Sequence, residues 1–192
     1  MKAIYIHLFC IGLMLLILFA SFIIAKQEMQ RNTLLISAFG FLALLWLIFT
    51  TSLTIAIKFL PNNEILKFLI KERRIVGLYG FFFALIHITL VLNFFFRWDI
   101  EKAIFGNTYR FIGGIALLLL SLLAITSNNF SMALLKKNWK TLHYLIYIII
   151  ILALIHAANI GLIFMKNDYI KYGIILLSAA VLLYKFKNLF LK

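Results

Sequence analysis

Six uninterrupted apolar stretches, separated by short clusters of charged residues, dominate this sequence. They cover roughly residues 3–25, 33–58, 75–96, 109–127, 141–164 and 168–184. An α-helix needs about 20 mostly apolar residues to span the hydrocarbon core of a bilayer, and the stretches have about that length. Each run is continuously apolar, whereas the strands of a transmembrane β-barrel alternate between apolar and polar residues. We therefore predict an all-α integral membrane bundle of six transmembrane helices.

The composition agrees with a chain that lies mostly in lipid. Of its 192 residues, 65% are hydrophobic and only 13% are charged, whereas a soluble domain carries about 25% charged residues. The longest connection, residues 59–74, is too short for a soluble domain, so we expect residues 1–192 to form a single transmembrane domain. The first apolar run is longer than the apolar core of a signal peptide, so we expect it to remain as a helix.

The distribution of Lys and Arg predicts the orientation, because cytoplasmic loops of membrane proteins are enriched in both. The N-terminus, the second and fourth loops and the C-terminus lie on one side and carry twelve cations, against seven on the other side. Both termini are therefore predicted to be cytoplasmic. The net charge of +13 then reflects this topology and attraction to anionic membrane lipid. Because the cations are scattered over short loops, nucleic acid is not an expected partner.

Two histidines lie deep inside apolar stretches, His87 in the third and His156 in the fifth. An ionisable side chain in hydrocarbon is costly, so each one suggests a functional site. At a rise of about 1.5 Å per residue, the two lie within about one turn of the same depth. Two imidazoles from different helices at one depth can hold a group between them. We interpret that group as haem iron, which becomes six-coordinate with two histidines and is then suited to electron transfer.

Cysteine and acidic residues narrow the kind of metal site. The chain has one cysteine, Cys10, and no C-x-x-C-H sequence, so any haem is bound without a covalent link, as haem b is. Zinc fits less well, because no acidic residue or third histidine lies at the depth of His87 and His156 to complete a tetrahedral site.

A second level is suggested by His143, which lies 13 residues before His156, and by His7 at a matching depth of the first helix. The two levels are about 20 Å apart, so cofactors at both would let electrons cross the bilayer in steps. In an ideal helix, however, His143 and His156 lie about 140° apart around the axis. Either the fifth helix is distorted or the two rings have different partners.

Each of these residues also has a structural interpretation. A histidine in a membrane helix can simply bond to a neighbouring helix, and His7 and His143 lie near the headgroups, where a polar ring costs little. Arg73 and Arg74 either anchor the third helix at the cytoplasmic face or bind haem propionates, a quinone or a flavin phosphate. Arg110 could bind a propionate of the outer haem in the same way.

Several spaced motifs point to a known family. They are Arg73-Arg74-x-x-Gly77-Leu78, His87, Thr126-Ser127, Trp139-x-x-Leu142-His143-x-x-x-Tyr147 and Ile155-His156. In these motifs, size and helix count, the chain resembles the MsrQ (YedZ) family over nearly its whole length. Members of that family are haem-binding membrane subunits of the bacterial periplasmic methionine sulfoxide reductase system, within the ferric-reductase-like transmembrane superfamily.

The resemblance implies a protein of the bacterial inner membrane that binds one or two b-type haems. It implies that electrons come from the quinone pool or a cytoplasmic flavin reductase and pass to a periplasmic molybdopterin-containing methionine sulfoxide reductase subunit. Flavin mononucleotide (FMN) is associated with the family as well. In the larger superfamily two helices each offer two histidines, but here Arg73 or Arg74 stands where the inner histidine of the third helix would fall. His7 is the candidate substitute ligand.

Two other functions remain open at this stage. The chain could be a stand-alone transmembrane ferric or quinone reductase, although it shows no NAD- or FAD-binding domain, so we expect substrate reduction to take place on a partner. It could also be a proton-coupled carrier that uses its histidines as a relay. A carrier would more typically show discontinuous helices and internal repeats, and no convincing repeat is present.

Overall fold

The computed structural model describes residues 3–190, which form helices joined by short turns, with no strand among them. The elements are α1 (Ile4–Ile24), α2 (Glu28–Phe59), α3 (Glu64–Lys71), α4 (Arg73–Val91), the π-helical segment η1 (Leu92–Phe96), α5 (Ile100–Phe105), α6 (Thr108–Ile125), α7 (Asn129–Leu135), α8 (Lys137–His143), α9 (Leu145–Ile160), α10 (Ile163–Lys166) and α11 (Asp168–Phe190).

Within the described residues, six spans are long and apolar enough to cross a membrane, which confirms the predicted fold class. They are Ile4–Ile24, Glu28–Phe59, Arg73–Phe96, Thr108–Ile125, Lys137–Ile160 and Asp168–Lys187. Helix α2 begins five residues earlier than expected. Polar residues in its first turns, such as Glu28 and Arg31, extend the helix beyond the apolar stretch.

Short helices fill several connections that were expected to be loops. Asn63, Asp99 and Asn128 each accept a hydrogen bond from the backbone N–H three residues further on, and so cap α3, α5 and α7. Asn and Asp are preferred at such N-cap positions, because their side-chain oxygens satisfy an otherwise unpaired N–H.

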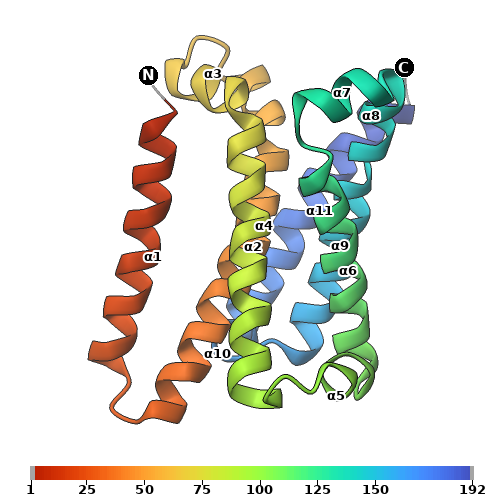
Figure 1. Cartoon of the computed structure of the whole chain (residues 1–192). Helices are drawn as coiled ribbons and strands as arrows, with labels where there is room; N and C mark the ends of the chain where they lie inside the picture. The colour runs from red at the N-terminus through yellow and green to blue at the C-terminus, as the bar shows by residue number, and fades with distance from the viewer. Residues whose placement is uncertain (1–2, 191–192) are drawn as a thin grey trace.

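The spans are arranged around α2. Helix α1 lies at one edge of the bundle and packs against α2 and α4, whereas α6 packs against α9 on the opposite side (Figure 1). Two groups of buried residues form the core. One joins α1, α2 and α4 around Cys10, Trp46 and Phe83, and the other joins α2, α6, α9 and α11 around Leu47 and Ile149. The central helix α2 contributes to both groups.

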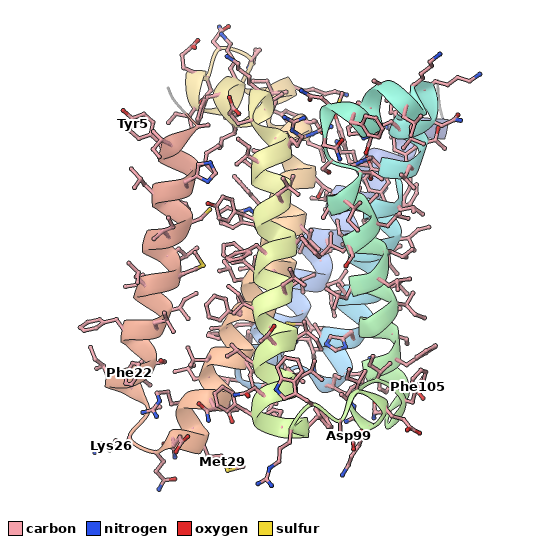
Figure 2. The ribbon with its side chains drawn as sticks, in the orientation of Figure 1. Tyr5, Phe22, Lys26, Met29, Asp99 and Phe105 are labelled. Atoms are coloured by element: carbon pink, nitrogen blue, oxygen red, sulfur yellow. The ribbon has the colours of Figure 1, made fainter. Side chains whose placement is uncertain are left out.

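The two ends of the bundle differ. Helix α1 begins and α11 ends at the end that also carries α3, α7 and α8, which we call the terminal end (Figure 1). The opposite, distal end carries α5, α10 and the turn between α1 and α2. Along α1, Tyr5 and Phe22 point away from the bundle, as side chains that face lipid do, while Lys26 and Met29 lie at the distal end (Figure 2).

Candidate functional site

His87 and His156 face each other in the distal half of the bundle. Their ring centroids are 6.4 Å apart and their planes are nearly perpendicular, at 86°. His87 belongs to α4, which packs against α2, and His156 belongs to α9, which packs against α6. The two rings therefore approach each other across the space between two packed helix pairs. The structure thus brings together the two residues that the depth argument paired.

Both rings are fixed by the same kind of hydrogen bond. Nδ1 of His87 is 2.9 Å from the carbonyl oxygen of Ile36 on α2, and Nδ1 of His156 is 2.9 Å from the carbonyl oxygen of Tyr109 on α6. A carbonyl only accepts, so each Nδ1 carries the proton and donates. In a neutral ring this leaves Nε2 with a free lone pair. Metal-binding histidines are oriented by such bonds from their other nitrogen.

A cavity of about 590 Å³ lies between α2, α4, α6 and α9, and both rings line it. Ile104 of α5 and Met165 of α10 line it near the distal end. Most of the lining is aliphatic or aromatic, with only a few polar groups. Protein cavities that bind small organic ligands have volumes of about 300–1,000 Å³ and this kind of lining.

The arrangement fits a haem better than a zinc ion. A metal bonded to both Nε2 atoms at about 2 Å would place the ring centroids about 6 Å apart, and they are 6.4 Å apart. Among the residues that the structure describes, no group of three or more His, Cys, Asp or Glu side chains could hold a metal ion. Two opposed imidazoles in an apolar cavity are the ligand set of a six-coordinate haem.

Arg110, in the first turn of α6, adds a positive charge to the cavity wall. Its guanidinium lies 5.0 Å from the centre of the Phe96 ring, and its Nη2 donates to the carbonyl of Lys102 at 3.3 Å. Its Nε is buried and has no hydrogen-bond partner among residues 3–190. A buried donor without a partner costs free energy, and a carboxylate in the cavity, such as a haem propionate, would supply the acceptor.

His143 lies apart from this cavity, in a cluster at the end of α6. Its ring stacks on Trp139 with centroids 4.0 Å apart, and Trp139 donates to the carbonyl of Thr126 at 2.8 Å. Nε2 of His143 is 3.4 Å from the hydroxyl of Thr126, which already donates to Leu122, so Nε2–H is the donor. The span is interrupted at Tyr144, between α8 and α9. The fifth helix is therefore distorted, and His143 and His156 also have different partners.

His7 does not meet His143, and the inner pair expected from the sequence is not formed. Nδ1 of His7 is 2.7 Å from the hydroxyl of Tyr79 on α4, at the edge of the bundle. Helices α1 and α8 lie on opposite sides of the bundle (Figure 1). Depth along the membrane normal predicts which residues share a level, but not which helices are neighbours.

Arg73 and Arg74 begin α4 at the terminal end, and both are exposed. Arg74 donates to the side-chain oxygen of Asn129 at 2.6 Å and so ties α4 to α7. Arg73 interacts electrostatically with His143 and with Lys185 of α11. Arg73 thus belongs to a cationic cluster at the terminal end, whereas Arg74 has a structural partner.

Sequence reasoning missed the groups that fix the two rings. Two of them are the backbone carbonyls of Ile36 and Tyr109. Every residue has such a carbonyl, so the sequence does not show which one accepts the hydrogen bond. The third is Gly40, which lies against His87. Its only signal was a glycine inside an apolar run, at a position that nothing in the sequence relates to His87.

Residues 38–154 match a family model described as "Ferric reductase like transmembrane component", which is more than half of the chain. The chain belongs to this ferric reductase-like transmembrane family. The matched segment contains His87, His143 and Arg110, whereas His7 and His156 lie outside it.

Curated relatives carry a more specific name, "Protein-methionine-sulfoxide reductase heme-binding subunit MsrQ". One from Xanthomonas campestris pv. campestris (strain 8004) is 42% identical over 115 residues, which cover 58% of this chain and 53% of the relative. Those from Xanthomonas axonopodis pv. citri and Herminiimonas arsenicoxydans are 40% and 35% identical over the same shares. The chain therefore spans about half the length of the curated relatives it matches. No solved structure matches.

The family match and these relatives confirm the resemblance to the MsrQ (YedZ) family. Together with the six apolar spans, they identify a multi-pass protein of the bacterial inner membrane.

Proposed function

We propose that this chain is a b-type haem electron-transfer subunit that serves a methionine sulfoxide reductase. The observation that carries the proposal is the pair of imidazoles, His87 and His156, whose centroids lie 6.4 Å apart at one cavity with each Nδ1 tied to a backbone carbonyl. The names of the curated relatives support the same function. A haem bound there would supply a one-electron couple at its iron.

In this proposal each residue of the cavity has a distinct role. His87 and His156 would hold the haem iron through their Nε2 atoms, and iron with two histidine ligands is suited to electron transfer rather than to oxygen binding. Arg110 binds a propionate through its unpartnered Nε. The apolar walls keep water away from the cofactor, which helps to set its potential.

Electrons would enter at the terminal end, which we assign to the cytoplasm from its excess of Lys and Arg. There His143 and Arg73 lie within electrostatic reach of each other, and they would bind the redox group that receives electrons. That group would be a second haem, FMN or a quinone, and the donor would be the quinone pool or a cytoplasmic flavin reductase. Arg74, bonded to Asn129, would hold the wall of this site, and His7 would remain outside it.

Electrons would leave at the distal end, where the cavity lies. The acceptor would be a periplasmic catalytic subunit that contains molybdopterin and reduces methionine sulfoxide. This assignment makes the chain the membrane half of an oxidoreductase, with the substrate chemistry on its partner.

The test is to purify the protein and its His87→Ala and His156→Ala variants and to measure the haem-to-protein ratio and the absorption spectrum. We expect a low-spin spectrum that sharpens on dithionite reduction, and loss of most haem from each variant. His7→Ala is the control and should keep its haem, because that ring bonds Tyr79. Full haem retention in either ligand variant would refute the ligand assignment. A colourless protein that moves protons in liposomes would instead support a carrier.

A further inference from the structure

We propose that Gly40 and Gly113 are positioning residues for the imidazoles of His87 and His156. Each glycine provides what we call a seat, a place on a helix surface where the absence of a side chain leaves room for one ring. Each glycine lets one ring lie directly against a helix backbone, at the point where the carbonyl four residues earlier accepts its Nδ1–H. The inference rests on the proposed haem function and extends it to residues outside the ligand set.

The first seat is on α2. A Cβ added to Gly40 would lie 2.7 Å from Nδ1 and 2.8 Å from Cε1 of His87. Real Cβ atoms essentially never approach another atom this closely. The carbonyl that accepts from the same Nδ1 belongs to Ile36, four residues before Gly40. Any side chain at position 40 would therefore compete with the imidazole for one space.

The second seat is on α6 and repeats the first. A Cβ added to Gly113 would overlap Nδ1 of His156 and would lie 2.6 Å from its Cε1. The accepting carbonyl belongs to Tyr109, again four residues earlier. Two helices that are far apart in the sequence thus present the same spacing of carbonyl and glycine to the two proposed ligands.

Helix geometry explains the spacing of four. In an α-helix the carbonyl of residue i accepts from the N–H of residue i+4, so the two groups lie one above the other. A ring nitrogen that reaches this carbonyl from the side passes over residue i+4. The carbonyl has a second lone pair for it, but only glycine leaves room for the ring.

Close helix packing does not account for these two glycines. At Gly40 and Gly113, the three nearest atoms to an added Cβ all belong to the imidazole. At Gly77, in the same α2–α4 interface, the nearest atom is a methyl carbon of Thr50 at 3.8 Å, which is an ordinary contact. The space at Gly40 and Gly113 is therefore occupied by a ring.

The seat has two consequences for a bound metal. It aims Nε2 into the cavity, because Nδ1 is held by the carbonyl and the ring is held by the backbone. It also keeps the hydrogen bond that raises the basicity of the ligand, which favours oxidised iron. A side chain at either glycine would push the ring away and weaken both effects.

The test compares Gly40→Ala and Gly113→Ala with Gly77→Ala as the matched control. We expect each of the first two to lose at least half of its haem, and the remaining haem to show a changed low-spin electron paramagnetic resonance signal and a higher midpoint potential. Gly77→Ala should match the parent protein in haem content, electron paramagnetic resonance signal and midpoint potential. If Gly40→Ala and Gly113→Ala also matched it, the inference would be wrong.

Imidazole rescue separates a displaced ring from a misfolded protein. In His87→Gly, added imidazole should restore the low-spin haem spectrum. It should also do so in His87→Gly combined with Gly40→Ala, because a free imidazole can move away from the new methyl group, while Gly40→Ala alone stays defective. If rescue worked in His87→Gly but failed in the double variant, the defect would lie in the fold and the inference would be overturned.

The two proposals fail in different ways. If His87→Ala kept its haem, the ligand assignment itself would be wrong. If His87→Ala lost its haem but Gly40→Ala and Gly113→Ala behaved like Gly77→Ala, only the role of the glycines would be wrong.

Discussion

Single side chains decide what the cavity can bind. His87 and His156 each donate a hydrogen bond from Nδ1 to a backbone carbonyl, which leaves Nε2 free. His143 instead donates from Nε2 to Thr126. The three histidines therefore offer different nitrogens to a metal. Hydrogen-bond partners make this difference, and the residue type alone does not.

Arg110 allows a prediction at the same scale. Arg110 lines the cavity in which we place a haem propionate, and its buried Nε has no hydrogen-bond partner among the described residues. A hydrogen bond to a charged group contributes about 1.5–3 kcal/mol, so Arg110→Ala should weaken haem binding roughly 10- to 100-fold. Haem titration of the apoprotein measures this change. Arg97→Ala removes an exposed cation near the same end and should leave the affinity unchanged. Equal affinities of the two variants would count against the propionate contact.

At the scale of helices, the first turn of α6 links folding to the site. Asn107 caps α6 by accepting from the backbone N–H groups of Tyr109 and Arg110. The next groups along are the Tyr109 carbonyl that holds His156, then Arg110, then Gly113. The N-terminal end of α6 therefore positions three groups of the proposed haem site, the Tyr109 carbonyl, Arg110 and Gly113.

Asn107→Ala should consequently affect both stability and haem. Loss of an N-cap costs about 1 kcal/mol, and fraying of this turn would also move the carbonyl that holds His156. We expect a lower unfolding temperature in detergent together with a reduced haem-to-protein ratio. Asn128→Ala, which removes the equivalent cap of α7, should lower stability to a similar extent and keep its haem. A haem ratio in Asn107→Ala equal to that in Asn128→Ala would show that the turn does not hold the site.

For the whole molecule, the sequence predicted what hydropathy and depth determine. The six spans follow from the length of apolar runs, and the shared level of His87 and His156 follows from their common depth, whereas their approach also needs α4 and α9 to face each other. The pairing of His7 with His143 failed because α1 packs against α2 and α4, where the His7 ring bonds Tyr79. The seat at Gly40 was missed because it depends on how α2 and α4 are packed.

Orientation is a property of the whole molecule and remains a prediction. If the terminal end is cytoplasmic, the cavity lies nearer the periplasm, where a periplasmic partner could take its electrons. The only native cysteine, Cys10, is fully buried, so cysteines introduced at the surface can be labelled selectively. In spheroplasts, Lys26→Cys at the distal end should react with a membrane-impermeant maleimide, whereas Lys140→Cys on α8 should react only after permeabilisation. The reverse pattern would place the cavity near the cytoplasm and would exclude electron transfer from it to a periplasmic reductase.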